Sequence, residues 1–185
     1  MKKHQKALLI AAALWVSTFP FSGFGTGAAY AATPAAVLPA RSQMKQSSIS
    51  ELTNDTRVFK VDPKIEAKNV RFQNRYGFDI AGHLYLPKNF DAQKQYKAVV
   101  VSGPVGAVKE QSSGLYAQEM AKHGYVAVAF DPSMTGESGG TRRNMASPDI
   151  FVEDYSAAVD FISNLKFVNP DKVGAIGICG LSGMA

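Results

Sequence analysis

The residues best suited to covalent chemistry lie near the C-terminal end of the sequence. Cys179 follows the apolar run Val173–Gly177 and is itself followed by Gly180. A nucleophile on a sharp turn between a strand and a helix needs small neighbours, because the turn is strained and the backbone passes close to the helix. Gly177 and Gly180 supply those small neighbours, so the spacing predicts Cys179 as a nucleophile that attacks an acyl carbon.

Two other interpretations of this turn stay open. A lone cysteine is most often a small buried hydrophobic residue, and Cys179 could be one. Ser182 is the alternative nucleophile, although its position three residues later places it inside the expected helix.

An acyl-transfer site also needs N–H groups that bind the developing oxyanion. The amide of the residue after the nucleophile, Gly180, is one candidate. A second donor is expected from the loop Gly103–Gly106, at Val105 or Gly106, because Pro104 has no N–H to give. The alternative is that Gly103–Gly106 is a plain turn.

A third loop, Asp131–Gly140, is polar and rich in glycine. It follows a predicted strand, so it lies at the same edge of the sheet as the other two loops. We expect it to shape the pocket through four residues, Asp131, Gly136, Glu137 and Ser138. A solvated turn is the alternative.

The elements that position these loops can be predicted from hydrophobic periodicity. Val70–Gln73 and Ile80–Leu86 alternate as the strands of an antiparallel hairpin. Strands and helices then alternate along the chain, which is typical of an α/β sheet with parallel strands and crossover helices. Their continuous apolar runs indicate that strands 97–101 and 125–130 are buried, whereas the final strand is expected to be an exposed edge with unpaired backbone groups. The predicted strands are 97–101, 125–130 and 173–177, and the predicted helices are 109–123 and 149–165.

The N-terminal segment has the features of a secretory signal peptide. Lys2, Lys3 and Lys6 precede the uncharged apolar run Ala7–Val16, and Ala29-Tyr30-Ala31 matches an A-x-A cleavage site. The apolar run is short for a membrane span, so we expect export and no stable membrane insertion after cleavage, with an uncleaved anchor as the alternative. Residues 32–65 are expected to be a linker or N-terminal extension, with a short helix possible at Ser50–Thr53, and residues 66–185 the folded domain.

Composition excludes several classes of protein. The chain has 185 residues, of which 46% are hydrophobic and 19% charged, so it is neither disordered nor a multi-span membrane protein. Its single cysteine excludes an internal disulfide framework and a four-cysteine zinc site. The net charge of +5 derives largely from the N-terminal lysines, so no nucleic-acid partner is expected. No dinucleotide or phosphate-binding glycine motif is present, and no cofactor or metal is predicted.

Three segments together resemble the α/β-hydrolase superfamily, most closely the bacterial dienelactone-hydrolase-like group. They are Gly103–Gln111, Ala129–Asp131 with Gly136–Gly140, and Val173–Gly180. The resemblance covers residues 66–185 and implies an α/β-hydrolase fold acting on small carboxylic ester or related acyl substrates. It implies a Ser or Cys nucleophile, which falls on Cys179, with an acid and a His. Leu181 and Ser102 depart from the group, which usually has Gly and His at these positions.

In this fold the acid and the His follow the nucleophile along the chain, and neither follows Cys179. His4 lies in the signal peptide, and His83 and His123 are expected to be ordinary structural or surface residues. We therefore expect an incomplete α/β-hydrolase fold that ends at its nucleophile turn and has no hydrolase activity as this chain. A non-catalytic exported ligand-binding module, or the product of a decayed gene, is the alternative.

Overall fold

A six-stranded mixed sheet carries the fold of the described residues. The computed structural model describes residues 46–185, so the predicted signal peptide and the first part of the predicted linker lie outside the described residues. The strand order is β1-β2-β3-β5-β4-β6. The strands are β1 (Ser48–Glu51), β2 (Glu66–Gln73), β3 (Asp79–Leu86), β4 (Tyr96–Ser102), β5 (Val126–Phe130) and β6 (Val168–Gly177).

The predicted change from antiparallel to parallel pairing is confirmed. β2 and β3 form the antiparallel hairpin, with Val70 opposite Gly82, and β3 continues antiparallel to β5. β4 then lies between β5 and β6 and is parallel to both. The carboxyl ends of β4, β5 and β6 therefore meet at one edge of the sheet, as the motif loops require.

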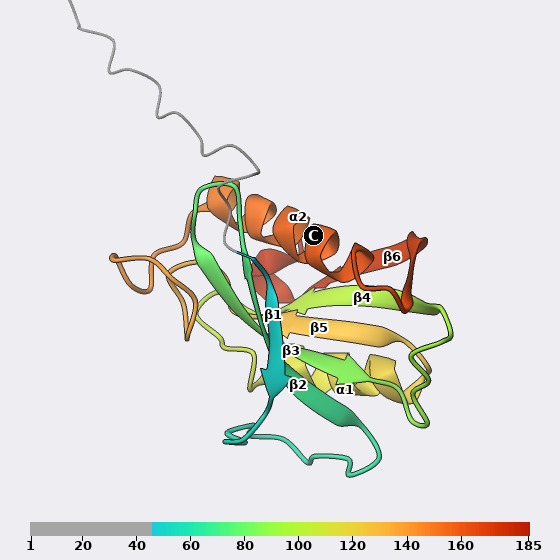
Figure 1. Ribbon diagram of the computed structural model, residues 1–185. Helices are drawn as coiled ribbons and strands as arrows, with labels where there is room; N and C mark the ends of the chain where they lie inside the picture. The colour runs from blue at the N-terminus through green and yellow to red at the C-terminus, as the bar shows by residue number, and fades with distance from the viewer. Residues whose placement is uncertain (1–45) are drawn as a thin grey trace, which may run out of the picture. The chain divides into compact units, whose positions relative to one another are not determined.

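Two helices cover opposite faces of the sheet (Figure 1). α1 (Ser112–Lys122) packs Ala117 and Ala121 against one face, whereas α2 (Pro148–Ser163) packs Phe151 and Phe161 against the other. β5 is buried along its whole length because its side chains alternate between the two layers. The sheet therefore separates two hydrophobic cores, one under each helix.

The helices and the last strand differ from prediction only at their ends. α1 begins at Ser112 rather than residue 109, because residues 109–111 belong to the preceding loop, where the Gln111 side chain accepts a hydrogen bond from Val108 N. α2 begins at Pro148, a residue suited to the first helical turn. β6 begins at Val168, five residues before the predicted start at 173, and its pairing with β4 has a register shift between Tyr96 and Ala98.

The segment before β2 differs from the expected linker. Ser48–Glu51, within the predicted linker or N-terminal extension 32–65, forms β1 antiparallel to β2, and the structure has this strand in place of the short helix at Ser50–Thr53. The chain that follows is also anchored to α1, since the Gln118 side chain donates a hydrogen bond to Lys60 O and accepts one from Asp62 N. These contacts join residues more than fifty positions apart, so local sequence pattern did not reveal them.

Candidate functional site

The three motif loops follow β4, β5 and β6, at the edge of the sheet where these parallel strands end (Figure 1). Hydrogen bonds fix the ends of the strands relative to one another. Ser102 O accepts from Ile178 N at 3.1 Å, and Ser102 Oγ donates to Phe130 O at 3.2 Å. The Tyr155 hydroxyl of α2 donates to Ile176 O at 3.2 Å. The three loops therefore start from strand ends that these hydrogen bonds hold in place relative to one another.

The turn after β6 has the geometry of a strained nucleophile turn. Cys179 has a φ of 56°, in the left-handed region that non-glycine residues rarely adopt, and the residue is exposed to solvent. A Cβ at Gly177 would lie 2.6 Å from Ser182 Cα and would also collide with the Leu181 carbonyl. The turn thus requires glycine at 177 and presents the Cys179 thiol outward.

Leu181 and Ser182 hold the inner side of this turn. The Leu181 side chain is fully buried in the core beneath α2, so it anchors the turn, although it departs from the usual glycine. Ser182 Oγ donates a 2.6 Å hydrogen bond to Cys179 O. The hydroxyl of Ser182, the alternative nucleophile, is therefore already engaged in a hydrogen bond that closes the turn.

The predicted oxyanion donors come together from two loops. A Cβ at Gly180 would lie 2.7 Å from Val105 Cγ2 and 3.8 Å from Val105 N, so the loop after β4 rests directly on the turn after β6. Among residues 46–185, neither the Val105 nor the Gly180 N–H donates a hydrogen bond. Gly106 follows with a φ of 84°, which turns the backbone sharply away after Val105. Of the two candidates in this loop, Val105 is the one that the structure brings against Gly180.

The loop after β5 is folded around a buried aspartate rather than solvated. Asp131 accepts from Lys109 N at 2.6 Å and Glu137 N at 2.9 Å, and its Oδ2 lies 3.2 Å from Lys109 Nζ. Ser138 is also buried, and its hydroxyl joins Asp131 O to Ala81 N. Gly136 is exposed and has a φ of 51°; a side chain there would collide with Asp131. Asp131, Gly136 and Ser138 therefore act in shaping the loop, and Glu137 lines a pocket.

Lys109 is the centre of a buried ion cluster that links two of the loops. Its Nζ lies 2.6 Å from Glu110 Oε1 and 3.1 Å from Glu137 Oε2, in addition to Asp131. Burial opposes the charge of Lys109, but the carboxylates outweigh burial and raise the pKa of Lys109. Burial raises the pKa of Asp131, and the nearby Lys109 opposes this shift. The cluster fixes the loop after β5 against the loop after β4.

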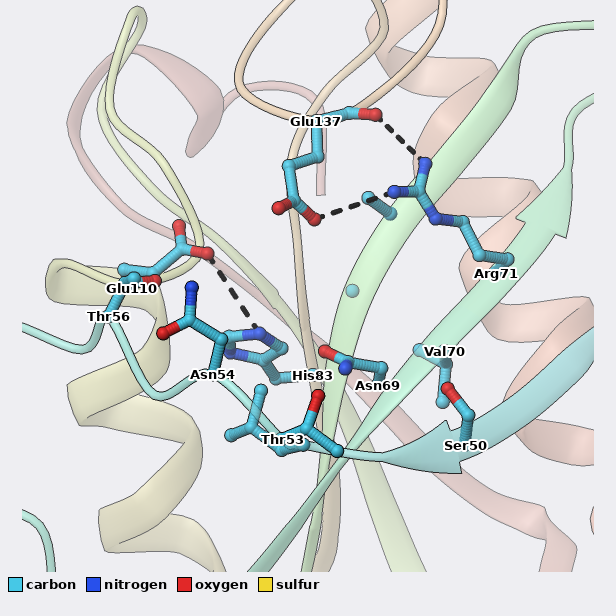
Figure 2. Close-up of a pocket in the computed structure, with 13 residues that line it drawn as sticks. Ser50, Thr53, Asn54, Thr56, Asn69, Val70, Arg71, His83, Glu110 and Glu137 are labelled. Atoms are coloured by element: carbon cyan, nitrogen blue, oxygen red, sulfur yellow. Dashed lines mark hydrogen bonds and ion pairs between the residues drawn. The ribbon is translucent and has the colours of Figure 1, made fainter.

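The two described histidines lie away from Cys179. His83 is buried in β3, pairs in register with Ala129, and places Nε2 3.9 Å from Glu110 Oε1 (Figure 2). His123 is exposed at the C-cap of α1, the end of the helix that leads back to the start of β5. Within residues 46–185, no imidazole or carboxylate makes a hydrogen bond with Cys179.

His83 and its pocket are what sequence reasoning missed. His83 and Glu110 line the same cavity, together with residues 50–56 of the N-terminal segment. The sequence signal was weak: a single histidine inside the apolar strand Ile80–Leu86, with its partners far along the chain.

The described part of the chain has neither a cluster of metal-ligating side chains nor a membrane-spanning helix. Residues 46–185 contain no group of three or more His, Cys, Asp or Glu side chains arranged to hold a metal ion. Among the same residues, no helix has the length and apolar character needed to cross a bilayer.

Comparison with known proteins adds the family context. No family model matches the chain. The uncharacterized protein PA2218 of Pseudomonas aeruginosa is 60% identical over 129 residues, which is 70% of this chain and 34% of that protein. Its crystal structure superposes with a TM-score of 0.69 at 56% identity, covering 75% of this chain and 43% of that one. A thiohydrolase from Eupenicillium brefeldianum is 32% identical over 60% of this chain and 34% of its own length.

The α/β hydrolase GrgF from Penicillium sp. sh18 superposes with a TM-score of 0.57 at 23% identity, covering 63% of this chain and 38% of that one. This likeness shows the fold: the described residues adopt part of the α/β-hydrolase fold. The chain spans about a third of the length of the curated relatives that it matches.

Proposed function

We propose that Cys179 is the nucleophile of an acyl-group hydrolase that acts on small carboxylic esters or thioesters. The observation that carries this proposal is the turn at Cys179, where an exposed thiol on a strained residue adjoins two N–H groups, those of Gly180 and Val105, that donate no hydrogen bond within residues 46–185. Free, oriented N–H groups beside a nucleophile are what acyl transfer requires. The motifs around this turn favour the dienelactone-hydrolase-like group within the superfamily.

The proposed reaction proceeds in two steps. The Cys179 sulfur attacks the acyl carbon, and the carbonyl π electrons move to oxygen, which accepts hydrogen bonds from Gly180 N and Val105 N. The tetrahedral intermediate collapses and expels the alcohol or thiol, which takes the proton that a base removed from Cys179. Water then attacks the thioester at Cys179, releases the acid and restores the thiol.

The base is not among the residues that adjoin Cys179 in the described structure. We propose that a His and an acid outside residues 46–185 activate the thiol, and that residues 46–185 alone do not turn over substrate. The length of the relatives supports this, since 129 matched residues make up only 34% of PA2218.

Two observations bear on the substrate and on the choice of nucleophile. The similar protein from Eupenicillium brefeldianum is described as a thiohydrolase, so thioesters belong in the first substrate panel beside esters. The Ser182 hydroxyl already donates to Cys179 O, which favours Cys179 over Ser182 as the attacking atom.

The decisive experiment compares Cys179→Ala with Ser182→Ala. The purified chain is incubated with p-nitrophenyl acetate and with an acetyl thioester, and both product release and intact mass are followed. We expect one acetyl group on the unmodified chain and on Ser182→Ala, none on Cys179→Ala, and no steady-state turnover.

Steady turnover by the chain that survives Cys179→Ala would refute the assignment of the nucleophile. Turnover that Cys179→Ala abolishes would instead refute the proposal that the His and the acid lie outside residues 46–185. Saturable binding of these compounds without any acetylation would favour the non-catalytic binding module.

We also propose that the protein is exported, on the basis of the sequence pattern of residues 1–31. Expression in a bacterial host, followed by fractionation and N-terminal sequencing of the product, tests this. Export predicts a product that begins at Ala32 outside the cytoplasm, and an uncleaved chain in the cytoplasm would contradict it.

A further inference from the structure

A second cavity lies away from Cys179, beside β1, β2 and β3. Its volume is about 350 Å³, which is within the range of small-molecule pockets. Residues from five separate parts of the chain line it: Ser50, Leu52, Thr53, Asn54, Thr56, Asn69, Val70, Arg71, Ala81, Gly82, His83, Glu110 and Glu137. Figure 2 shows His83 between the N-terminal segment and the loop that carries Glu110. The cavity is predominantly polar in its lining.

One side chain that lines this cavity is buried and lacks a hydrogen-bond partner. His83 is 2% exposed, and its Nδ1 has no partner in the described structure. Only two other buried side-chain atoms among residues 46–185 share this property, Arg57 Nη1 and Tyr85 Oη. Both belong to the same neighbourhood, since the Tyr85 ring contacts His83 edge-on and lies under the Arg57 guanidinium. Buried polar atoms are normally paired, so this cluster indicates a missing partner.

The surroundings of His83 define what that partner must offer. Burial, and next the charge of Lys109, lower the pKa of His83 to about 4, so the ring is neutral at pH 7. Nε2 faces the Glu110 carboxylate at 3.9 Å, which favours the proton on Nε2. Nδ1 then carries a lone pair, and its partner must be an O–H or N–H donor.

Charge balance at the cavity argues for a neutral ligand. Glu110 and Glu137 both already face the Lys109 ammonium, at 2.6 Å and 3.1 Å. Arg71 donates to Glu137 O at 2.9 Å and lies 3.5 Å from Glu137 Oε2. Each charged side chain that lines the cavity therefore has a partner of opposite sign among the described residues, and none of them is left isolated to select an ion.

The remaining lining groups are hydroxyls and amides, which both donate and accept hydrogen bonds. They come from Ser50, Thr53, Asn54, Thr56 and Asn69. A ligand that matches such a lining presents several groups that also donate and accept, as hydroxyl groups do. We propose that this cavity binds a small neutral polyol of monosaccharide size, one hydroxyl of which donates to His83 Nδ1.

This proposal does not depend on the proposed acyl chemistry, because Cys179 is outside the cavity. The test uses the whole chain with ¹⁵N-labelled histidine. The chain has three histidines, so His4 and His123 serve as internal references for His83. Imidazole ¹⁵N spectra are recorded during separate titrations with D-xylose, D-glucose, glycerol and the diamine putrescine.

We expect a saturable shift of the His83 Nδ1 signal with at least one of the sugars, and no shift of His4 or His123. Asn54→Ala removes one exposed lining group, and Glu110→Gln removes one lining charge. Asn54→Ala should weaken binding about tenfold, as expected for one lost hydrogen bond, and Glu110→Gln should weaken it because the carboxylate that favours the proton on His83 Nε2 is lost. Glu119→Gln is the matched control, because Glu119 also pairs with a lysine, Lys122, at 2.7 Å, outside the cavity.

Several outcomes would overturn the proposal. A His83 signal that does not move with any polyol would mean that the cavity holds only water. A response to putrescine alone would assign the cavity to a cation. Unchanged affinity in both Asn54→Ala and Glu110→Gln would mean that the sugar binds elsewhere. Cys179→Ala should bind the sugar as the original chain does, because Cys179 is outside the cavity.

Discussion

At the residue scale, the account depends on the conformation of Cys179 and on the glycines around it. Cys179 adopts a φ of 56° because Gly177, two residues earlier, allows the chain to double back against Leu181 and Ser182. Leu181 is buried beneath α2, so the core anchors the turn. Packing beneath the turn, and not a hydrogen bond of its own side chain among residues 46–185, therefore holds the Cys179 thiol in its exposed position.

The Gly177→Ala substitution tests this packing directly. The added methyl group would collide with backbone atoms, which cannot rotate away, so we expect unfolding stability to fall by about 2 kcal/mol or more. Gly183→Ala is the matched control, since nothing lies within 4 Å of a Cβ there. Urea denaturation measures both variants, and equal stabilities would show that the turn is not constrained as described.

Gly180→Ala should behave differently from Gly177→Ala. Its new methyl group would meet the end of the Val105 side chain, which is exposed and able to rotate. We therefore expect a smaller loss of stability and a displaced Val105 amide, seen as a shift of the Val105 backbone NMR signal. A stability loss as large as that of Gly177→Ala would contradict the description of the Gly180 site as facing only the movable end of the Val105 side chain.

At the element scale, buried polar clusters rather than apolar contacts fix the loops that surround the candidate site. Asp131 binds two backbone N–H groups and the Lys109 ammonium, and so joins the loop after β5 to the loop after β4. Asp131→Asn would leave the buried Lys109 less well paired. We expect a loss of about 3 kcal/mol of stability, and faster hydrogen exchange at the amides of Lys109 and Glu137. Asp171→Asn, at an exposed position, is the control.

A second buried carboxylate links the β2–β3 turn to α2. Asp154 accepts hydrogen bonds from Asn74 Nδ2, Ser133 N and Ser133 Oγ, each at 2.7 Å. Burial nevertheless raises the pKa of Asp154 to about 6. The folded chain therefore holds this proton more tightly than the unfolded chain does. The contribution of Asp154 to stability is greatest below pH 4 and decreases as pH rises towards 6.

Asp154→Asn isolates this effect because asparagine does not titrate. The stability difference between the original chain and the variant should move in favour of the original chain by about 2 kcal/mol on going from pH 7 to pH 4. Urea denaturation at several pH values measures it. A difference that stays constant with pH would mean that Asp154 has an ordinary pKa in the folded chain.

At the scale of the whole molecule, the sheet has one long edge strand. Among residues 46–185, β6 pairs only with β4, and Gly174 and Ala175 are exposed. Unpaired strand edges favour pairing with another chain. We expect the purified chain to self-associate with rising concentration, and Ala175→Lys to reduce this. Analytical ultracentrifugation measures both, and a strictly monomeric chain at all concentrations would contradict the expectation.

The sequence predicted those parts of this molecule that depend on local pattern. The hairpin, the buried strands and the small residues around Cys179 are encoded within a few neighbouring positions, and the structure has all of them. β1, the buried loop around Asp131 and the His83 cavity instead depend on residues far apart in the sequence, such as Lys109 and Asp131. Such contacts leave no periodic signal, so they became visible only in the folded chain.

The most direct test of the central claim is the rate at which Cys179 is acetylated by p-nitrophenyl acetate, in the folded chain and in the same chain unfolded in urea. The rates are corrected for the effect of urea on a small thiol. If the Gly180 and Val105 amides stabilise the oxyanion, the folded chain reacts about a hundredfold faster, as expected for one to two such donors. A folded chain that reacts no faster than the unfolded one would contradict the account.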